Sequence, residues 1–278
     1  PSTKVVTMGG VSYTTSTTFD DKGRPYDVTY PTVAGVSGIV VRHHYATNGE
    51  LYQLTDTAGA VYQKYTGLNS RGSVNSVQYG SVVSMTQTMD AATGWVTGLS
   101  ATAGSTSIET QSMSYDAVGN LTSRSISFGL GNTANLTESF TYDNLHRVLS
   151  RTVNTFANVS GSVTLSESYA YDDNGNLTRK GNVGYYQYNV AGKPNRLAAI
   201  WQNSNFTGTQ NYAFSYDANG NVLSDSKRSY TYTSFDKPSL ITQGTNTTSF
   251  SYGPARQLIK RVDTRSGQTT STVMIDGL

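Results

Sequence analysis

The sequence has no cysteine, six prolines, two tryptophans and little charge for its 278 residues. The absence of cysteine excludes disulfides, thiolate metal sites and a cysteine nucleophile. No run reaches the roughly 18 consecutive apolar residues of a membrane-spanning helix. The chain opens on Pro1, without an initiator Met or an apolar signal core, so we expect a fragment of a longer protein.

The charged residues make up 14% of the chain, with 20 basic and 18 acidic side chains scattered along it. No run of Lys or Arg could follow a phosphate backbone, so nucleic acid is not an expected partner. Ser, Thr, Asn, 27 Gly and 20 Tyr dominate instead. This composition favours strands and turns, and tyrosine can cover a thin sheet while its hydroxyl stays hydrated.

One seven-residue phrase recurs along the chain. It is clearest at residues 115–121, 171–177 and 216–222, where a Tyr-Asp pair is followed by Gly-Asn and an aliphatic residue. Weaker copies begin at Phe19, Tyr45, Leu68, Met89, Tyr142, Tyr188, Phe235 and Tyr252. Such internal repetition predicts an array of similar supersecondary units.

The phrase predicts a β-hairpin turn. Its first and seventh residues pair across the strands if the third to fifth residues form a loop whose last member is left-handed, a conformation that glycine adopts without strain. An aspartate in the second position can accept hydrogen bonds from the free amides of the turn. The structural motif residues are Tyr115, Asp116, Gly119, Leu121, Tyr142, Asp143, Tyr171, Asp172, Gly175, Leu177, Tyr188, Gly192, Tyr216, Asp217, Gly220 and Val222.

The expected fold class is all-β. Alternation along the strands gives one aromatic face and one polar face, and no helical stripe is present. We expect residues 1–278 to form a single array of tandem antiparallel hairpins, as a curved ribbon-like sheet or a partial shell or barrel. The stretch 69–112 is poor in charge and is expected to be irregular. His146, Ser239 and Arg256 occupy the predicted glycine position in three copies, where less regular turns are expected.

The phrase Tyr-Asp-x-x-Gly-Asn-Leu, followed by Thr-Ser-Arg after Leu121 and Thr-Arg-Lys after Leu177, resembles the YD repeats of the Rhs protein family. The resemblance extends from about Phe19 to Arg261. It implies a sheet ribbon that spirals into a hollow shell, as in bacterial Rhs and polymorphic toxins, the B and C components of insecticidal toxin complexes, and teneurins. In the toxins, such a shell encloses a C-terminal toxic segment.

The resemblance implies a non-catalytic structural module of a bacterial secreted or cell-surface protein, with a core segment and an effector of the parent chain as its partners. The family's toxins release the effector through aspartates in a core segment. Because this sequence ends at Ile275-Asp276-Gly277-Leu278, we expect it to stop before that segment. The piece is therefore expected to form an open wall, whose free edges could pair into homodimers.

The sequence gives less support to a catalytic or metal-binding role than to a structural one. Paired carboxylates such as Asp172-Asp173 suit a hydrolase or a weak cation site, but the turn role accounts for them and the spacing departs from a calcium loop. His43 and His44 are adjacent on a predicted strand and point to opposite faces, which does not suit a shared metal. We expect no cofactor. The alternative function is a carbohydrate-binding or adhesion module, with Trp95, Trp201, Tyr185 and Tyr186 as candidate glycan contacts, unless these rings pack between hairpins.

Overall fold

The protein is described by a computed structural model that covers residues 1–33, 35–129, 135–156 and 162–274. The described residues form twenty-five β-strands and no helix, which confirms the all-β prediction. The first thirteen strands are β1 (Ser2–Met8), β2 (Val11–Phe19), β3 (Pro25–Thr29), β4 (Val40–Tyr45), β5 (Leu51–Thr55), β6 (Val61–Leu68), β7 (Val74–Tyr79), β8 (Val83–Met89), β9 (Val96–Ala103), β10 (Thr106–Tyr115), β11 (Leu121–Phe128), β12 (Asn135–Tyr142) and β13 (Val148–Phe156).

The second half of the chain has shorter strands. They are β14 (Ser162–Tyr171), β15 (Leu177–Lys180), β16 (Gly184–Gln187), β17 (Ala199–Trp201), β18 (Gln210–Ala213), β19 (Ser215–Tyr216), β20 (Val222–Ser224), β21 (Ser229–Tyr232), β22 (Pro238–Gln243), β23 (Asn246–Tyr252), β24 (Leu258–Arg265) and β25 (Gln268–Val273). The chain divides into two compact units, Pro1–Ser166 and Glu167–Leu278.

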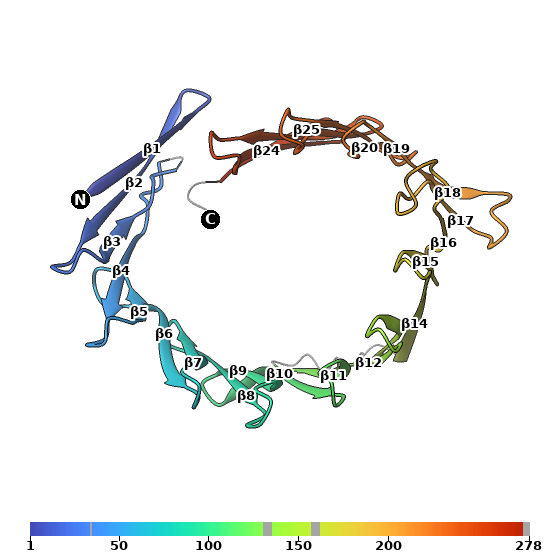
Figure 1. Ribbon diagram of the computed structural model, residues 1–278. Helices are drawn as coiled ribbons and strands as arrows, with labels where there is room; N and C mark the ends of the chain where they lie inside the picture. The colour runs from blue at the N-terminus through green and yellow to red at the C-terminus, as the bar shows by residue number, and fades with distance from the viewer. Residues whose placement is uncertain (34, 130–134, 157–161, 275–278) are drawn as a thin grey trace. The chain divides into compact units, whose positions relative to one another are not determined.

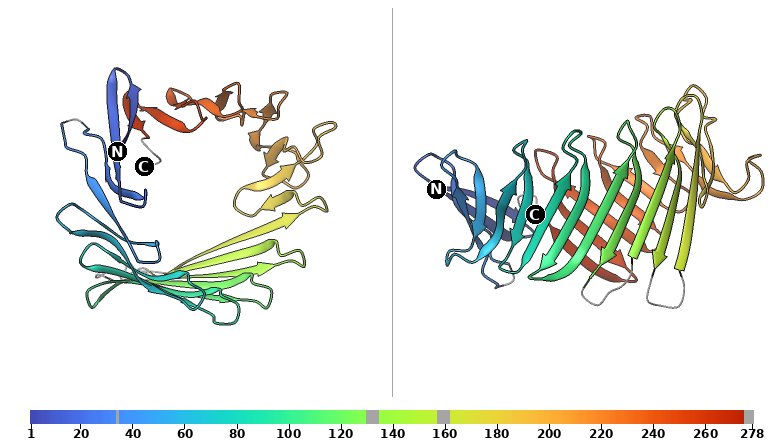
Figure 2. Two further views of the ribbon diagram at one scale, coloured as in Figure 1. Left: turned by 60° about the vertical axis from the view of Figure 1, so that its left-hand side comes forward. Right: turned by 90° about the horizontal axis from the view of Figure 1, so that it is seen from below.

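Strands pair with their sequence neighbours. In the first unit, every strand from β1 to β13 is antiparallel to the next one (Figure 1). In the second unit the same holds from β14 to β18 and from β19 to β25. Because direction alternates, the connections after even-numbered strands of the first unit share one edge of its sheet, as Figure 2 allows the reader to follow. We call this edge the motif edge, since the Tyr-Asp turns lie there.

A β-bulge recurs beside these turns. Tyr115 lies opposite Leu121, whereas Ser114 lies opposite Ser123, so β11 carries one extra residue. The same shift occurs next to the first residue of the phrase at Tyr45, Tyr142, Tyr171, Tyr216 and Tyr252. A bulge bends its strand and increases the local twist. The same local bend is therefore expected beside each of these turns.

The sheet is thin and has little conventional core. The buried hydrophobic residues of the described part are Val153, Ala199 and Ile200. Buried polar residues include Glu138 and Asp225, with 3% and 2% of their surface exposed. Stability must therefore come largely from strand pairing and from contacts between neighbouring hairpins.

The stretch 69–112, which was expected to be irregular, consists largely of paired strands. This segment contains β7, β8, β9 and most of β10, which pair antiparallel with register shifts between Thr88 and Met89 and between Ser107 and Glu109. Its low charge and many small residues are compatible with regular hairpins, because the connections at Gly80 and Gly104 are short turns with positive φ at glycine. The low charge of this segment thus does not prevent strand pairing.

Candidate functional site: the Tyr-Asp turns

The predicted turn is present in the clearest copies. At residues 115–121 the amide of Gly119 donates to the carbonyl of Asp116 at 3.2 Å, and the amide of Asp116 donates to the carbonyl of Asn120 at 2.9 Å. The φ angles of Gly119, Gly175 and Gly220 are 95°, 84° and 95°. This is the three-residue loop with a left-handed last residue that the sequence predicts.

The aspartate in the second position caps its own turn. Asp116 Oδ1 accepts the main-chain amides of Val118 and Asn120, at 3.0 and 2.9 Å, and Oδ2 accepts Asn120 Nδ2 at 2.8 Å. The hydrogen bond from the Asn120 side chain is the main cause that holds the pKa of Asp116 below its usual value. Both carboxylate oxygens are thus engaged in turn formation. The pairing of the second and sixth side chains recurs in Asp20–Arg24, Asp143–Arg147, Asp172–Asn176 and Asp217–Asn221.

The tyrosine in the first position bonds to the preceding copy of the phrase. The hydroxyl of Tyr142 donates to the main-chain carbonyl of Leu121, the residue that closes the turn before it, at 2.7 Å. Sequence reasoning missed this contact because its two ends lie in different repeats. Equivalent bonds of 2.7–3.1 Å are Tyr45 to Pro25, Tyr115 to Val96, Tyr188 to Leu177, Tyr216 to Leu197, Tyr232 to Val222, and Tyr252 to Pro238.

The same tyrosine rings receive a side chain from the preceding turn. Arg24 Cζ lies 4.1 Å from the ring centroid of Tyr45, and Lys237 Nζ lies 5.5 Å from that of Tyr252. Both cations immediately precede the residue that closes their turn. Cations over tyrosine faces add an attraction of about 0.5–1 kcal/mol at exposed sites. Tyr45 and Tyr252 therefore contact the preceding turn by both the hydroxyl and the face of the ring.

Two turns replace the fifth-position glycine with a side chain that reaches the preceding turn. His146 has a φ of 61°, and its Nδ1 lies 3.0 Å from Asn120 Nδ2. Asp236 also has a φ of 61°, and its Oδ1 accepts the side-chain amides of Asn219 and Asn221 at 2.9 and 2.8 Å. Non-glycine residues in this conformation are strained by about 1–2 kcal/mol. The contacts to the neighbouring turn offset that cost.

A third substitution follows the same rule. Arg256, with a φ of 59°, places its guanidinium 5.4 Å from the ring centroid of Phe235, and its carbonyl accepts Lys237 Nζ at 2.8 Å. The expectation of less regular turns at His146 and Arg256 was wrong, because both keep the amide-to-carbonyl pattern of the glycine turns.

One copy of the phrase begins three residues earlier than the sequence predicted. The turn predicted to begin at Phe235 begins at Tyr232, which pairs with Pro238, while Asp236 takes the fifth position in place of Ser239. The amide of Asp236 donates to the carbonyl of Thr233, as in the other turns. Two aromatic residues three positions apart, with no glycine between them, made the frame ambiguous.

One turn of this type lies outside the predicted set. Thr55 pairs with Val61, Gly59 has a φ of 94°, and Asp56 Oδ1 accepts the amide of Ala60. It joins β5 to β6 and so lies at the edge opposite the motif edge. A search anchored on an apolar first residue could not find it, although Asp-x-x-Gly followed by an aliphatic residue was a usable signal.

The Tyr188 copy is longer than predicted. Gln187 pairs with Ala199, so the connection from β16 to β17 spans residues 188–198. Gly192 keeps a positive φ of 69°, and the hydroxyl of Tyr188 still bonds to Leu177. The copy thus retains the tyrosine contact but not the seven-residue loop.

Away from the turns, a buried carboxylate joins three strands of the first unit. Glu138 on β12 lies directly opposite Arg124 on β11 and forms ion pairs with Arg124 and with Arg151 on β13. Burial raises the pKa of Glu138, and hydrogen bonds from Arg151 and Arg124 outweigh that effect and lower it. Arg124 and Arg151 each occupy the tenth position of their repeats, three residues after the closing residue.

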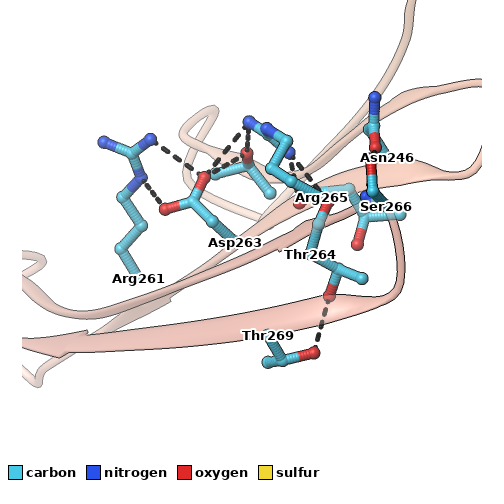
Figure 3. Close-up of polar contacts among 9 residues, drawn as sticks. Asn246, Arg261, Asp263, Thr264, Arg265, Ser266 and Thr269 are labelled. Carbon is cyan, nitrogen blue, oxygen red and sulfur yellow. Dashed lines mark hydrogen bonds and ion pairs between the residues drawn. The ribbon is translucent and has the colours of Figure 1, made fainter.

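A related cluster lies in the second unit (Figure 3). Asp263 pairs with both Arg261 and Arg265, and its Oδ1 also accepts Thr248 Oγ1 at 2.7 Å. The hydrogen bonds from Arg261 and Thr248 lower the pKa of Asp263. The arginines are half exposed, so this network fixes the pairing of β23 and β24 more than it offers a reactive group.

The candidate glycan residues do not form one site. Tyr185 and Trp201 lie opposite each other on β16 and β17, whereas Tyr186 pairs with Ile200 on the other face. Trp201 Nε1 donates to Gln187 Oε1 at 2.9 Å. Trp95 lies in the first unit, with its ring centroid 5.3 Å from that of Tyr115. A role in glycan binding stays a prediction, and only Tyr185 and Trp201 could act together.

The described part of the chain gives little indication of a metal site or of a membrane-spanning helix. His43 and His44 pair with Leu54 and Gln53 respectively, and His44 Nε2 lies 2.9 Å from Thr55 Oγ1. The described residues hold no group of three or more histidines and carboxylates close enough to bind a metal ion. Within the same residues, no helix has the length and hydrophobicity to cross a membrane.

Comparison with solved structures identifies the fold. A chain of the Photorhabdus luminescens Tc holotoxin pore is similar to this protein, with a TM-score of 0.72 and 18% sequence identity. The match covers 95% of the residues of this protein. The TcdB2-TccC3 complex gives the same values, and the TcdB2-TccC3-Cdc42 complex gives a TM-score of 0.69 at 17% identity. This protein spans only 14% of those chains. No family model and no curated protein sequence matches it.

Proposed function

We propose that this protein is a wall segment of a YD-repeat shell, within a bacterial secreted or surface protein of the Rhs type. In the parent chain it would help to enclose or present a C-terminal effector. The observation that carries the proposal is the recurring bond from a turn tyrosine to the turn before it, as at Tyr45, Tyr115, Tyr142, Tyr232 and Tyr252. Such coupling makes neighbouring hairpins the main packing partners and lets a thin wall extend without a globular core.

Two further observations support this proposal. The fold is similar to parts of much longer chains in Tc toxin complexes. The recurring Tyr-Asp-x-x-Gly-Asn phrase is the sequence feature of the YD-repeat family, and we propose that residues 1–278 are one continuous array of that kind. The wall would have no catalytic role, because the recurring carboxylates are occupied by turn amides and by neighbouring side chains.

Limited proteolysis of the full-length parent protein tests enclosure. The segment C-terminal to this wall should resist protease in the intact protein and become sensitive when the wall is weakened by Tyr142→Phe combined with Glu138→Gln. A parent protein carrying the exposed substitution Tyr62→Phe serves as the matched control. Equal cleavage of the C-terminal segment in the intact parent and in the segment expressed alone would contradict enclosure.

A second candidate is a carbohydrate-binding or adhesion role at Tyr185 and Trp201. Their direct opposition on β16 and β17 is the observation that favours it, since neighbouring aromatic side chains offer a surface for a sugar ring. A glycan array should show binding that Trp201→Ala removes and Trp95→Ala preserves. Identical arrays for the native protein and the Trp201→Ala variant would exclude this role.

A further inference from the structure

The long connection between β16 and β17 departs from the repeat. Residues 188–198 take the place of a three-residue loop and introduce Lys193 and Arg196. Departures from an otherwise consistent local pattern are expected at functional or strained positions. Here the inserted residues create a hollow between this connection and the turns at 171–177 and 216–222.

The hollow has a volume of about 520 Å³, within the range of small-molecule sites. It is lined by residues of all three connections, so it is a feature of their arrangement and not of one loop. Its side chains that can contact a ligand are Asn176, Tyr188, Lys193, Asn195, Arg196 and Tyr216.

The hollow contains two cationic side chains, Lys193 and Arg196. Among the described residues, neither Lys193 nor Arg196 forms an ion pair with a carboxylate, whereas Arg24, Arg147 and Arg228 each pair with an aspartate of their own turn. The carboxylates in the flanking turns are directed elsewhere: Asp172 binds Asn176, and Asp217 binds Asn221. An anionic group that entered the hollow would meet two cations without displacing an ion pair.

The guanidinium of Arg196 is already positioned. Its Cζ lies 4.9 Å from the ring centroid of Tyr216, and the hydroxyl of Tyr216 is fixed by its bond to Leu197 at 2.7 Å. A stacked guanidinium keeps its planar edge available for two parallel hydrogen bonds, the geometry that a carboxylate accepts. Less side-chain entropy is therefore lost when a ligand binds.

The remaining lining groups suit a sugar. The hydroxyl of Tyr188 is committed to Leu177, which leaves its ring edge and face as apolar lining. Asn195 Oδ1 accepts Asn176 Nδ2 at 3.1 Å, so the amide group of Asn195 keeps both of its donor hydrogens for ligand oxygens. Aromatic surface beside amide donors is the usual composition of a site for polyhydroxylated rings.

We propose that this hollow binds a carboxylate-bearing sugar of the uronic acid class, with the carboxylate on Arg196 and Lys193 and the ring against Tyr188 and Tyr216. The site is separate from Tyr185 and Trp201, and it is independent of whether the wall encloses an effector. The expected affinity is modest, because the hollow is open to solvent on one side.

Calorimetric titration of the intact protein tests the proposal with three probes. Sodium glucuronate should bind saturably, whereas glucose and sodium acetate should each bind at least tenfold more weakly, because glucose lacks the charge and acetate lacks the ring. Raising the salt concentration should weaken glucuronate binding.

Substitutions of single cationic residues distinguish a loss of ligand binding from a loss of stability. Lys193→Gln changes an exposed side chain that has no ion-pair partner among the residues that the structure describes. It should weaken glucuronate binding about tenfold without a change in Tm. Arg196→Gln should abolish binding, and Lys22→Gln, in a turn of the first unit, should leave it unchanged. Absence of saturable glucuronate binding would overturn the proposal. So would acetate binding of equal strength, or glucuronate binding that survives both Lys193→Gln and Arg196→Gln.

Discussion

The hydroxyl of Tyr142 donates a 2.7 Å hydrogen bond to the main-chain carbonyl of Leu121, which closes the turn one repeat earlier. Burial raises the pKa of the Tyr142 hydroxyl, so this group stays protonated and able to donate at all ordinary pH values. The bond explains why the first position of the phrase favours tyrosine over phenylalanine, although either ring could pair with an aliphatic residue across the hairpin.

Tyr142→Phe should therefore destabilise the protein by about 1 kcal/mol, because it removes one hydrogen bond and leaves a partly buried carbonyl without its donor. Chemical denaturation measures the change. Tyr62→Phe is the matched control in the same unit, since Tyr62 is 40% exposed, and it should change the free energy of unfolding by less than about 0.5 kcal/mol. Equal effects of the two substitutions would refute the role assigned to the hydroxyl.

Two glycines with nearly equal backbone angles separate conformational strain from steric conflict. Gly59 and Gly119 have φ angles of 94° and 95°, but an added Cβ would meet nothing within 4 Å at Gly59 and would lie 2.9 Å from Trp95 Cζ2 at Gly119. Gly59→Ala should cost about 1 kcal/mol, from the left-handed backbone alone. Gly119→Ala should cost more, by about 1 kcal/mol or above, as the tryptophan is displaced.

Thermal melting of both variants in parallel measures the difference. Tryptophan fluorescence should shift in Gly119→Ala and not in Gly59→Ala. If Gly119→Ala were the more stable of the two, the packing of Trp95 against this turn would be wrong.

Glu138 should give the first unit a distinct dependence on pH. Its folded-state pKa is lowered relative to the unfolded chain, so its contribution to stability is complete above the unfolded value of about 4.3 and is lost as the pH falls through the folded value. Glu138→Gln should cost about 2 kcal/mol at pH 7, because it leaves two arginines without their shared partner.

The free energy of unfolding of Glu138→Gln should approach that of the native protein as the pH is lowered below about 4, when the native carboxylate becomes protonated. The comparison isolates Glu138, because the two proteins share all of their other carboxylates. A stability difference that stayed constant from pH 7 to pH 3 would rule out this linkage.

The two non-glycine turns in which a side chain bonds to the preceding turn should respond differently to glycine. His146→Gly removes one neutral hydrogen bond and relieves about 1 kcal/mol of backbone strain, so stability should change little. Asp236→Gly relieves the same strain but removes a carboxylate that accepts two amides, and it should destabilise the protein by about 1 kcal/mol. An increase in Tm for Asp236→Gly would show that the contacts to the preceding turn contribute little.

The outer edge of β1 should support self-association. β1 pairs with β2 along its full length, and Val5 and Val11 of this hairpin are 56% and 52% exposed. Edge strands of this kind template pairing with another chain. Val5→Lys should reduce any dimer detected by analytical ultracentrifugation, whereas a protein that sediments as a monomer at high concentration would exclude this edge.

Local chemistry explains what the sequence predicted well. The loop of 115–121 was predictable because Asp116, Gly119 and Asn120 encode its conformation within seven residues. The contact of Tyr142 with Leu121 was not predictable, because its acceptor is a main-chain atom that carries no residue signature. The extra residue in β11, Thr122, was not predictable either, because no residue type marks that position.

The errors also have physical causes. The turn at Thr55 shows that the first position need not be aromatic when the loop residues supply the geometry. The frame at Tyr232 shows that glycine can be absent when Asp236 gains contacts with the preceding turn. The long connection at 188–198 was read as an ordinary copy because its Tyr and Gly keep their spacing, although the strands close only at Gln187 and Ala199.

Because the hydroxyls of Tyr45, Tyr115, Tyr142 and the tyrosines like them bond to a backbone oxygen, this contact needs no particular side chain in the preceding repeat. Hairpins could therefore be duplicated, deleted or exchanged between positions while the coupling between them persists. A protein built in this way can change its length or acquire a specialised connection at one place, and the rest of the array need not adapt in sequence.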